Sequence, residues 1–175
     1  MTTRDGVEAK AAGVFDGLVA LHEMPDDKWE RVLGVDLTAS MQLCGAVLPH
    51  LRAVGGGGAI VNVASIAALG SSGGAAYTVS KHGLLALSES IAWMYRDGGI
   101  RCNIICPGFV ETDTGASVVH EAAWGRERMA SFLAMGGRRA QPGEIATLLS
   151  WLASAGVSNV NGAELSSKSV DEPLA

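Results

Sequence analysis

Tyr77 and Lys81 are the residues of this chain whose types and spacing could most directly do chemistry. They stand one helical turn apart in an apolar helical pattern, so both side chains are expected on one face. A phenol beside an ammonium can pass a proton to or from a substrate oxygen, because the positive charge favours the phenolate and draws the tyrosine pKa from about 10 toward neutrality. Ser65 ends an upstream apolar run and adds a hydroxyl that can anchor the oxygen.

The elements that must position these residues are predicted from the apolar pattern. Buried strands are expected over residues 59–64 and 100–106, and a short last strand over 162–166. Helices are expected over 26–52, 75–96 and 143–154. Alternating strands and helices predict an α/β fold with three layers and a parallel sheet.

A further motif, Pro107-Gly108 after the second strand, completes a set that resembles the short-chain dehydrogenase/reductase family. The matching segments occur in family order, at residues 29–37, 60–65, 77–81, 100–112 and 141–146. The resemblance implies a single domain over residues 1–175 that corresponds to the C-terminal two-thirds of the family fold. This domain would contain a Rossmann-like parallel sheet. The resemblance also implies NAD(P)-dependent interconversion of an alcohol and a ketone by Ser65, Tyr77 and Lys81. The segment 112–137 would then be a mobile lid, with an ordinary amphipathic helix as the alternative.

The resemblance assigns cofactor contacts as well. Tyr77 and Lys81 would hold the nicotinamide ribose, and the Val110 backbone and Thr112 hydroxyl would meet the carboxamide. These two residues follow Pro107 and Gly108, in a loop at a strand end where an open α/β sheet places its ligands. A plain strand-to-loop turn is the competing interpretation.

The family's Gly-rich turn, which brings a pyrophosphate to a helix N-terminus, has no counterpart before Tyr77. Glycines 55–58 precede a strand and are expected to end a helix. The family's Asn-Asn-Ala-Gly strand end has lost both asparagines at residues 10–13. The sheet is therefore expected to be N-terminally truncated, and NAD or NADP to bind no tighter than millimolar, about −4 kcal/mol.

Asp36 is the departure from the family pattern that most directly concerns the predicted catalytic residues. It occupies the slot where family members usually carry an asparagine that holds a water in a proton relay to the lysine. A carboxylate there could pair with Lys81 and hold its charge, which would weaken the lysine's pull on Tyr77, or it could break the relay. We count Asp36 with the candidate catalytic residues.

The composition limits the partners. A net charge of −5, with no run of Lys and Arg, argues against a nucleic-acid surface. The N-terminus does not read as a signal peptide, and no apolar stretch is expected to reach membrane-spanning length. Cys44, Cys102 and Cys106 are expected to be buried, reduced thiols of a cytoplasmic protein. No histidine or cysteine has metal-ligand spacing, so no metal is predicted.

Two functions from different classes remain open. The leading hypothesis is the family's oxidoreductase activity on a small-molecule alcohol or ketone of undetermined identity. The alternative is a non-redox protein, either an inactive subunit or a cofactor-free acid–base enzyme, because the glycine turn is absent. A homo-oligomer, most simply a two-fold dimer through helices 26–52 and 75–96, is expected because strand 59–64 would be an edge unless residues 7–12 cover it. The same helices carry apolar residues beyond one face: Met41, Leu48, Leu85, Trp93 and Met94.

Overall fold

The computed structural model describes residues 13–112, 122–134 and 138–167. Helix α1 (Asp26–Leu33) begins after Pro25 with two aspartates in its first turn, where acidic side chains favour the helix dipole. It continues through a π-helical turn (Gly34–Thr38) into α2 (Ala39–Val54). Gly55 ends α2 in the left-handed conformation, as the glycine run predicts.

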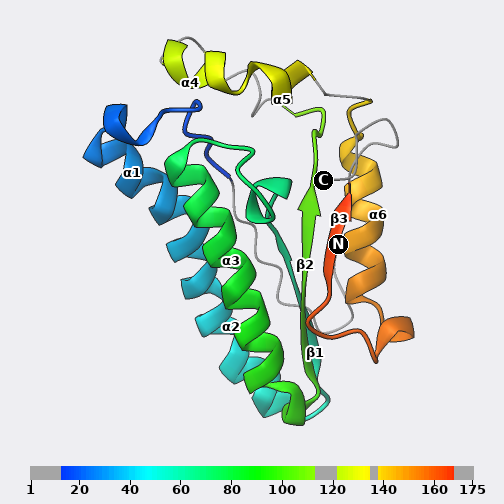
Figure 1. Cartoon of the computed structure of the whole chain (residues 1–175). Coiled ribbons are helices and arrows are strands. Elements are labelled where there is room, and N and C mark those ends of the chain that lie inside the picture. The colour runs from blue at the N-terminus through cyan, green and yellow to red at the C-terminus, as the bar shows by residue number, and fades with distance from the viewer. Residues whose placement is uncertain (1–12, 113–121, 135–137, 168–175) are drawn as a thin grey trace.

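Three parallel strands form the described sheet, in the order β1-β2-β3. Strand β1 (Gly58–Val63) is followed by α3 (Ala75–Met94), and β2 (Ile100–Pro107) runs beside it. Helix α6 (Pro142–Ala153) then leads to β3 (Glu164–Ser167). Helices α2 and α3 cover one face of the sheet and α6 covers the other, which confirms the three-layer α/β fold (Figure 1).

The core follows the alternation of side chains along β2, which lies in the middle of the described sheet. On one face, Ile100 and Cys102 pack with residues of α2 and α3, among them Cys44. Farther along the same face, Ile104 and Cys106 pack against Leu84 of α3. The other face meets α6, where the Arg101 guanidinium donates to the carbonyl oxygen of Leu152 at 2.9 Å. All three cysteines are buried free thiols, as expected.

The predicted lid contains two short helices in its described part, α4 (Ala123–Arg128) and α5 (Ala130–Ala134). They lie over the end of the molecule that holds the C-terminal ends of β1 and β2 (Figure 1). Residues 113–121 and 135–137 are outside the described part, so the choice between a lid and an ordinary helix stays open. Residues 7–12, the segment that would have to cover the edge of β1 if the edge were not exposed, are also outside it.

Two expectations about the long helices were wrong. The continuous helix Asp26–Val54 does reach membrane-spanning length, and one 18-residue window has a mean hydropathy of 1.4. Small residues and few charges raise the mean hydropathy of this window although it has no long run of large apolar side chains. The core helix of a protein can have the same length and hydropathy. Leu48 is buried, with 5% exposed, because it packs against β2 and α3. Met41, Trp93 and Met94 are exposed as predicted, at 47%, 67% and 71%.

Candidate active site

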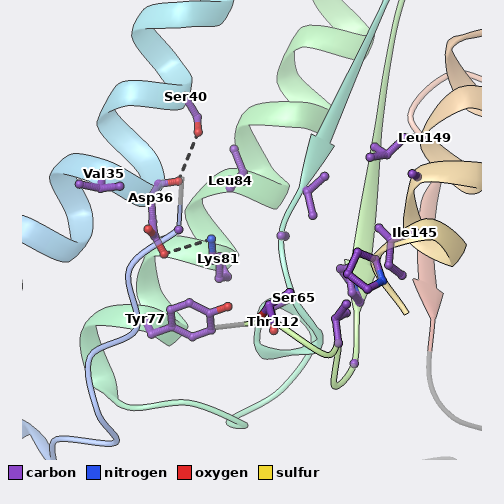
Figure 2. A pocket seen from close by; sticks show the side chains of 18 residues that line it. Val35, Asp36, Ser40, Ser65, Tyr77, Lys81, Leu84, Thr112, Ile145 and Leu149 are labelled. Carbon is purple, nitrogen blue, oxygen red and sulfur yellow. Dashed lines mark hydrogen bonds and ion pairs between the residues drawn. The ribbon is translucent and has the colours of Figure 1, made fainter. Parts of the chain in front are cut away.

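A cavity of about 410 Å³ opens at the C-terminal ends of β1 and β2 (Figure 2). Its position follows from the parallel sheet, because loops at that edge can splay apart and admit a ligand. The cavity brings together every candidate catalytic and cofactor-binding residue predicted from the sequence, and the helix 26–54, β1, α3 and α6 supply most of its other lining. The predicted residues that line it are Asp36, Ser65, Tyr77, Lys81, Pro107, Gly108, Val110 and Thr112.

Tyr77 and Lys81 lie on the inward face of α3 and Ser65 lies just after β1. Ser65 lies near the Tyr77 phenol, where its side chain lowers the phenol pKa. The Lys81 Nζ atom lies 5.1 Å from the centroid of the Tyr77 ring, in the range of a cation–π contact. Ser65 Oγ also accepts the Ala67 N–H at 3.2 Å, which holds the serine at the start of a short 3₁₀ turn.

The pKa of Tyr77 is shifted upward, whereas the sequence predicts a downward shift. Burial of the phenol raises its pKa above the ordinary value of 10, because a phenolate there would lose its hydration. The Ser65 side chain lowers the pKa, and the negative charges of Asp36 and Asp16 raise it further. The prediction that the lysine draws the Tyr77 pKa toward neutrality is therefore wrong for the ligand-free protein.

Asp36 forms a buried ion pair with Lys81. Its Oδ2 atom lies 3.0 Å from Lys81 Nζ, and the two side chains are 0% and 6% exposed. Its Oδ1 atom accepts the Val14 N–H at 2.7 Å. The carboxylate thus joins α3 to the chain segment at Gly13, and the expected pairing with the lysine is confirmed.

A local irregularity of the helix accompanies this inward position of Asp36. The residue sits in the π-helical turn between α1 and α2, where the backbone carbonyl of Asp36 accepts a hydrogen bond from Ser40 Oγ at 3.4 Å. π-Turns widen a helix by one residue and frequently occur at functional sites. The apolar periodicity predicted one uninterrupted helix here and gave no signal for the turn.

The loop after β2 is tied down at both ends. Gly108 N–H donates to the Ser167 carbonyl at 2.7 Å, and Glu111 N–H donates to the Ala140 carbonyl at 2.9 Å. Val110 pairs with Ala140 in a parallel bridge. These contacts fix the backbone of the loop that places Val110 and Thr112 on the cavity wall.

Two asparagines of the strands make structural contacts. Asn103 on β2 donates to the Val160 carbonyl at 2.9 Å and accepts the Ala163 N–H at 2.9 Å, so it ties two backbone segments together. Asn62 on β1 donates to the side chain of Ser88 at 2.8 Å. Within the described ranges, no group of histidine, cysteine and acidic side chains is arranged to hold a metal ion.

Sequence reasoning missed the segment just before α1. Gly13 faces the ion pair, and a Cβ there would lie 3.8 Å from Lys81 Nζ. The Phe15 ring meets Tyr77 edge to face, with centroids 5.0 Å apart. Asp16 is 1% exposed and accepts the Tyr77 N–H at 2.9 Å. Asp16-Gly17 is a common turn dipeptide, but no periodic pattern links it to a helix so far along the chain.

Comparison with known proteins decides the family. Residues 4–169 match the family described as Enoyl-(Acyl carrier protein) reductase. The chain is 37% identical over 155 residues to 3beta-hydroxysteroid dehydrogenase 2 of Eggerthella lenta, covering 88% of this chain and 60% of that protein. The chain belongs to the short-chain dehydrogenase/reductase family.

Other short-chain dehydrogenases/reductases give the same picture. Short-chain dehydrogenase/reductase cdmF of Talaromyces verruculosus is 37% identical over 161 residues, which is 87% of this chain and 62% of that protein. The structure of 4-hydroxyisoleucine dehydrogenase complexed with NADH and succinate superposes with a TM-score of 0.76 at 25% identity, covering 90% of this chain and 64% of that one. The chain thus spans less than two-thirds of the length of these relatives.

Proposed function

We propose that this chain carries the acid–base half of an NAD(P)-dependent oxidoreductase that interconverts an alcohol and a ketone. The observation that carries the proposal is the meeting of the Tyr77 phenol, the Ser65 hydroxyl and the Lys81 ammonium on one cavity wall. A carbonyl oxygen bound beside these groups would meet two hydroxyl donors and a nearby positive charge. The dehydrogenase names of the relatives support this reaction class.

In the reduction direction, a ketone oxygen would sit between the Ser65 and Tyr77 hydroxyls. Ser65 would donate a hydrogen bond that orients the carbonyl, and Tyr77 would transfer its proton to the oxygen as negative charge develops there. Lys81 would stabilise the resulting phenolate through its positive charge. Asp36 would hold the ammonium in place through the 3.0 Å ion pair.

The residues present fit the nicotinamide-ribose end of a dinucleotide. Gly13 leaves the space beside the Lys81 ammonium open, and Val110 and Thr112 line the opposite wall. A bound nicotinamide would supply or accept the hydride. In the described part of the chain, no strand, glycine turn and helix form a pyrophosphate site, and glycines 55–58 lie at the opposite end of β1. The adenosine end of the cofactor therefore has no predicted contact here.

The test is a turnover assay with the purified chain, NADH or NADPH, and a panel of ketones that includes 3-ketosteroids. We expect slow reduction that Tyr77→Phe lowers by about 10² to 10⁴, the usual contribution of a positioned acid. Tyr95→Phe, the matched control on the other tyrosine, should retain the parent rate. Parent turnover equal to that of Tyr77→Phe would refute the proposal and favour the non-redox alternative.

A further inference from the structure

Asp16 is a buried carboxylate that the proposed mechanism does not use. It lies in the segment between Gly13 and α1, and only 1% of its surface is exposed. Burial raises its pKa, against the hydrogen bonds from surrounding backbone N–H groups that favour the charge. A charged group is costly to bury unless it is paired or hydrogen-bonded.

The carboxylate serves the first turn of α3, the helix that carries Tyr77. Asp16 Oδ2 accepts the Tyr77 N–H at 2.9 Å, and the neighbouring backbone N–H groups of Gly74 and Ala76 favour the charged carboxylate and lower its pKa. The first N–H groups of a helix have no partner within it. Gly74, at the N-cap position, has no side chain to supply one. Asp16 therefore caps α3 from outside the helix.

The same carboxylate shapes the turn on which α4 rests. Asp16 Oδ1 accepts the Leu18 N–H at 3.2 Å. Gly17 and Leu18 both have left-handed backbone angles, with φ of 75° and 63°, a conformation that a leucine adopts only under constraint. The Leu18 carbonyl then lies so close to Gly125 of α4 that a Cβ on that glycine would collide with it.

We propose that Asp16 is a positioning residue for Tyr77: its carboxylate fixes the first turn of α3 and joins it to the Gly17–Leu18 turn that supports α4. One buried group thereby holds both the start of the helix that carries Tyr77 and the turn against which α4 packs. This role rests on the proposed function of Tyr77, but the contact itself is testable without turnover.

Amide hydrogen exchange followed by NMR tests the cap. In the parent protein, we expect the Ala76 and Tyr77 amides to be protected although they lie in the first helical turn. Asp16→Ala should speed their exchange by about tenfold, as expected for the loss of a helix cap, while Leu84 farther along α3 changes little. Asp97→Asn, at a side chain that is 92% exposed, is the matched control. Equal acceleration along the whole helix, or none, would overturn the proposal.

Gly74 offers the same test from the other side of the contact. A Cβ at Gly74 would collide with both Asp16 oxygens, while the Gly74 φ of −70° suits any residue. Gly74→Ala should therefore lower the melting temperature of the parent protein but lower it much less in the Asp16→Ala background, where the space is free. Additive effects of the two substitutions would contradict the contact.

The pKa of Tyr77 is a readout that would not change if Asp16 had a purely structural role. In a Tyr95→Phe background, the ¹³Cζ resonance of Tyr77 reports its own titration, and Asp16→Asn should lower the Tyr77 pKa because a nearby negative charge is removed. Should the Asp16 variants not fold, the parent amide signals of Leu18 and Tyr77 should titrate with one common midpoint, because both amides donate to the same carboxylate. Unrelated titrations of the two amides overturn the proposal. Unchanged protection refutes the positioning role alone, whereas absent turnover with intact protection refutes the proposed function alone.

Discussion

Lys81 Nζ and Asp36 Oδ2 lie 3.0 Å apart, and both side chains are buried. The resemblance places an asparagine in the Asp36 slot, so this direct ion pair is a feature of the present chain. It holds the ammonium next to Tyr77 while an opposing charge reduces the ammonium's effect on the phenol. The protonation of Tyr77 therefore depends on Asp36 as well as on Lys81, and not on the lysine alone.

The first prediction concerns this pair. Asp36→Asn should lower the Tyr77 pKa, because the carboxylate that now raises it is removed and the lysine charge is no longer offset. The ¹³Cζ titration of Tyr77 in the Tyr95→Phe background measures the change. Glu89→Gln, an exposed position on the same helix, should leave the titration as it is. A Tyr77 titration that does not respond to Asp36→Asn would show that the two charges do not communicate.

The second prediction concerns pH and the direction of the reaction. Because the Tyr77 pKa lies above its ordinary value, the residue is a neutral phenol at neutral pH and is ready to donate a proton. Ketone reduction should therefore vary little between about pH 6 and about pH 9, while alcohol oxidation, which needs the phenolate, should keep rising over the same range. Initial rates in both directions check this. An oxidation rate that levels off near neutrality would mean that the pKa is lowered when ligands bind.

The third prediction concerns cofactor affinity. With only the nicotinamide-ribose contacts, we expect NADH and NADPH to bind with dissociation constants no tighter than about 1 mM, or about −4 kcal/mol. Calorimetric titration of the parent chain measures both. Nicotinamide mononucleotide is the matched control ligand, since it lacks the adenosine end and should bind nearly as well. Micromolar binding of the dinucleotides would reveal a pyrophosphate site outside the described residues.

The fourth prediction concerns assembly. Trp93 and Met94 on α3 and Met41 on α2 leave 67%, 71% and 47% of their surface exposed. We expect a two-fold dimer that buries them, because burying large exposed apolar side chains favours association. Trp93→Glu should weaken the dimer by about 2 kcal/mol or more, as for a central aromatic anchor. Light scattering over a concentration series measures the effect.

The control for assembly is Trp151→Glu on α6. That tryptophan is 47% exposed but lies on the opposite face of the sheet, so its replacement should leave the mass unchanged. A parent protein that scatters as a monomer at micromolar concentration would contradict the dimer.

The fifth prediction concerns acid stability. The Arg138 guanidinium and the Gln141 N–H hold the pKa of Glu144 at about 2, below its ordinary 4.5, in a capping box at the start of α6. Since the pKa is lowered by folding, this carboxylate stabilises the fold above pH 4.5 and loses that effect as the pH falls toward about 2. Glu144→Gln should lower the urea midpoint at neutral pH and flatten its fall in acid. Glu127→Gln on α4 is the control, and an identical acid profile for both would contradict the role of the cap.

The sequence by itself determined the fold family, the element order and the identity of the candidate site. Strand β2 reads as buried because its side chains alternate between two covered faces, and the spacing of Tyr77 and Lys81 places both on one face of α3. These features depend on neighbours a few residues away, so periodicity and local propensity are enough to predict them. The family motifs then predict the roles of these residues.

Only the tertiary structure decided how the site is held and charged. Whether Asp36 would pair with Lys81 or break a relay depended on a π-helical turn that no periodicity predicts. The burial of Asp16 against α3 joins segments 61 residues apart in the chain. The direction of the Tyr77 pKa followed from desolvation, which depends on everything packed around the phenol and not on its nearest charge. Spacing along the chain predicts which face of a helix a side chain occupies. Its ion pairs and its pKa depend on the elements that pack against that face.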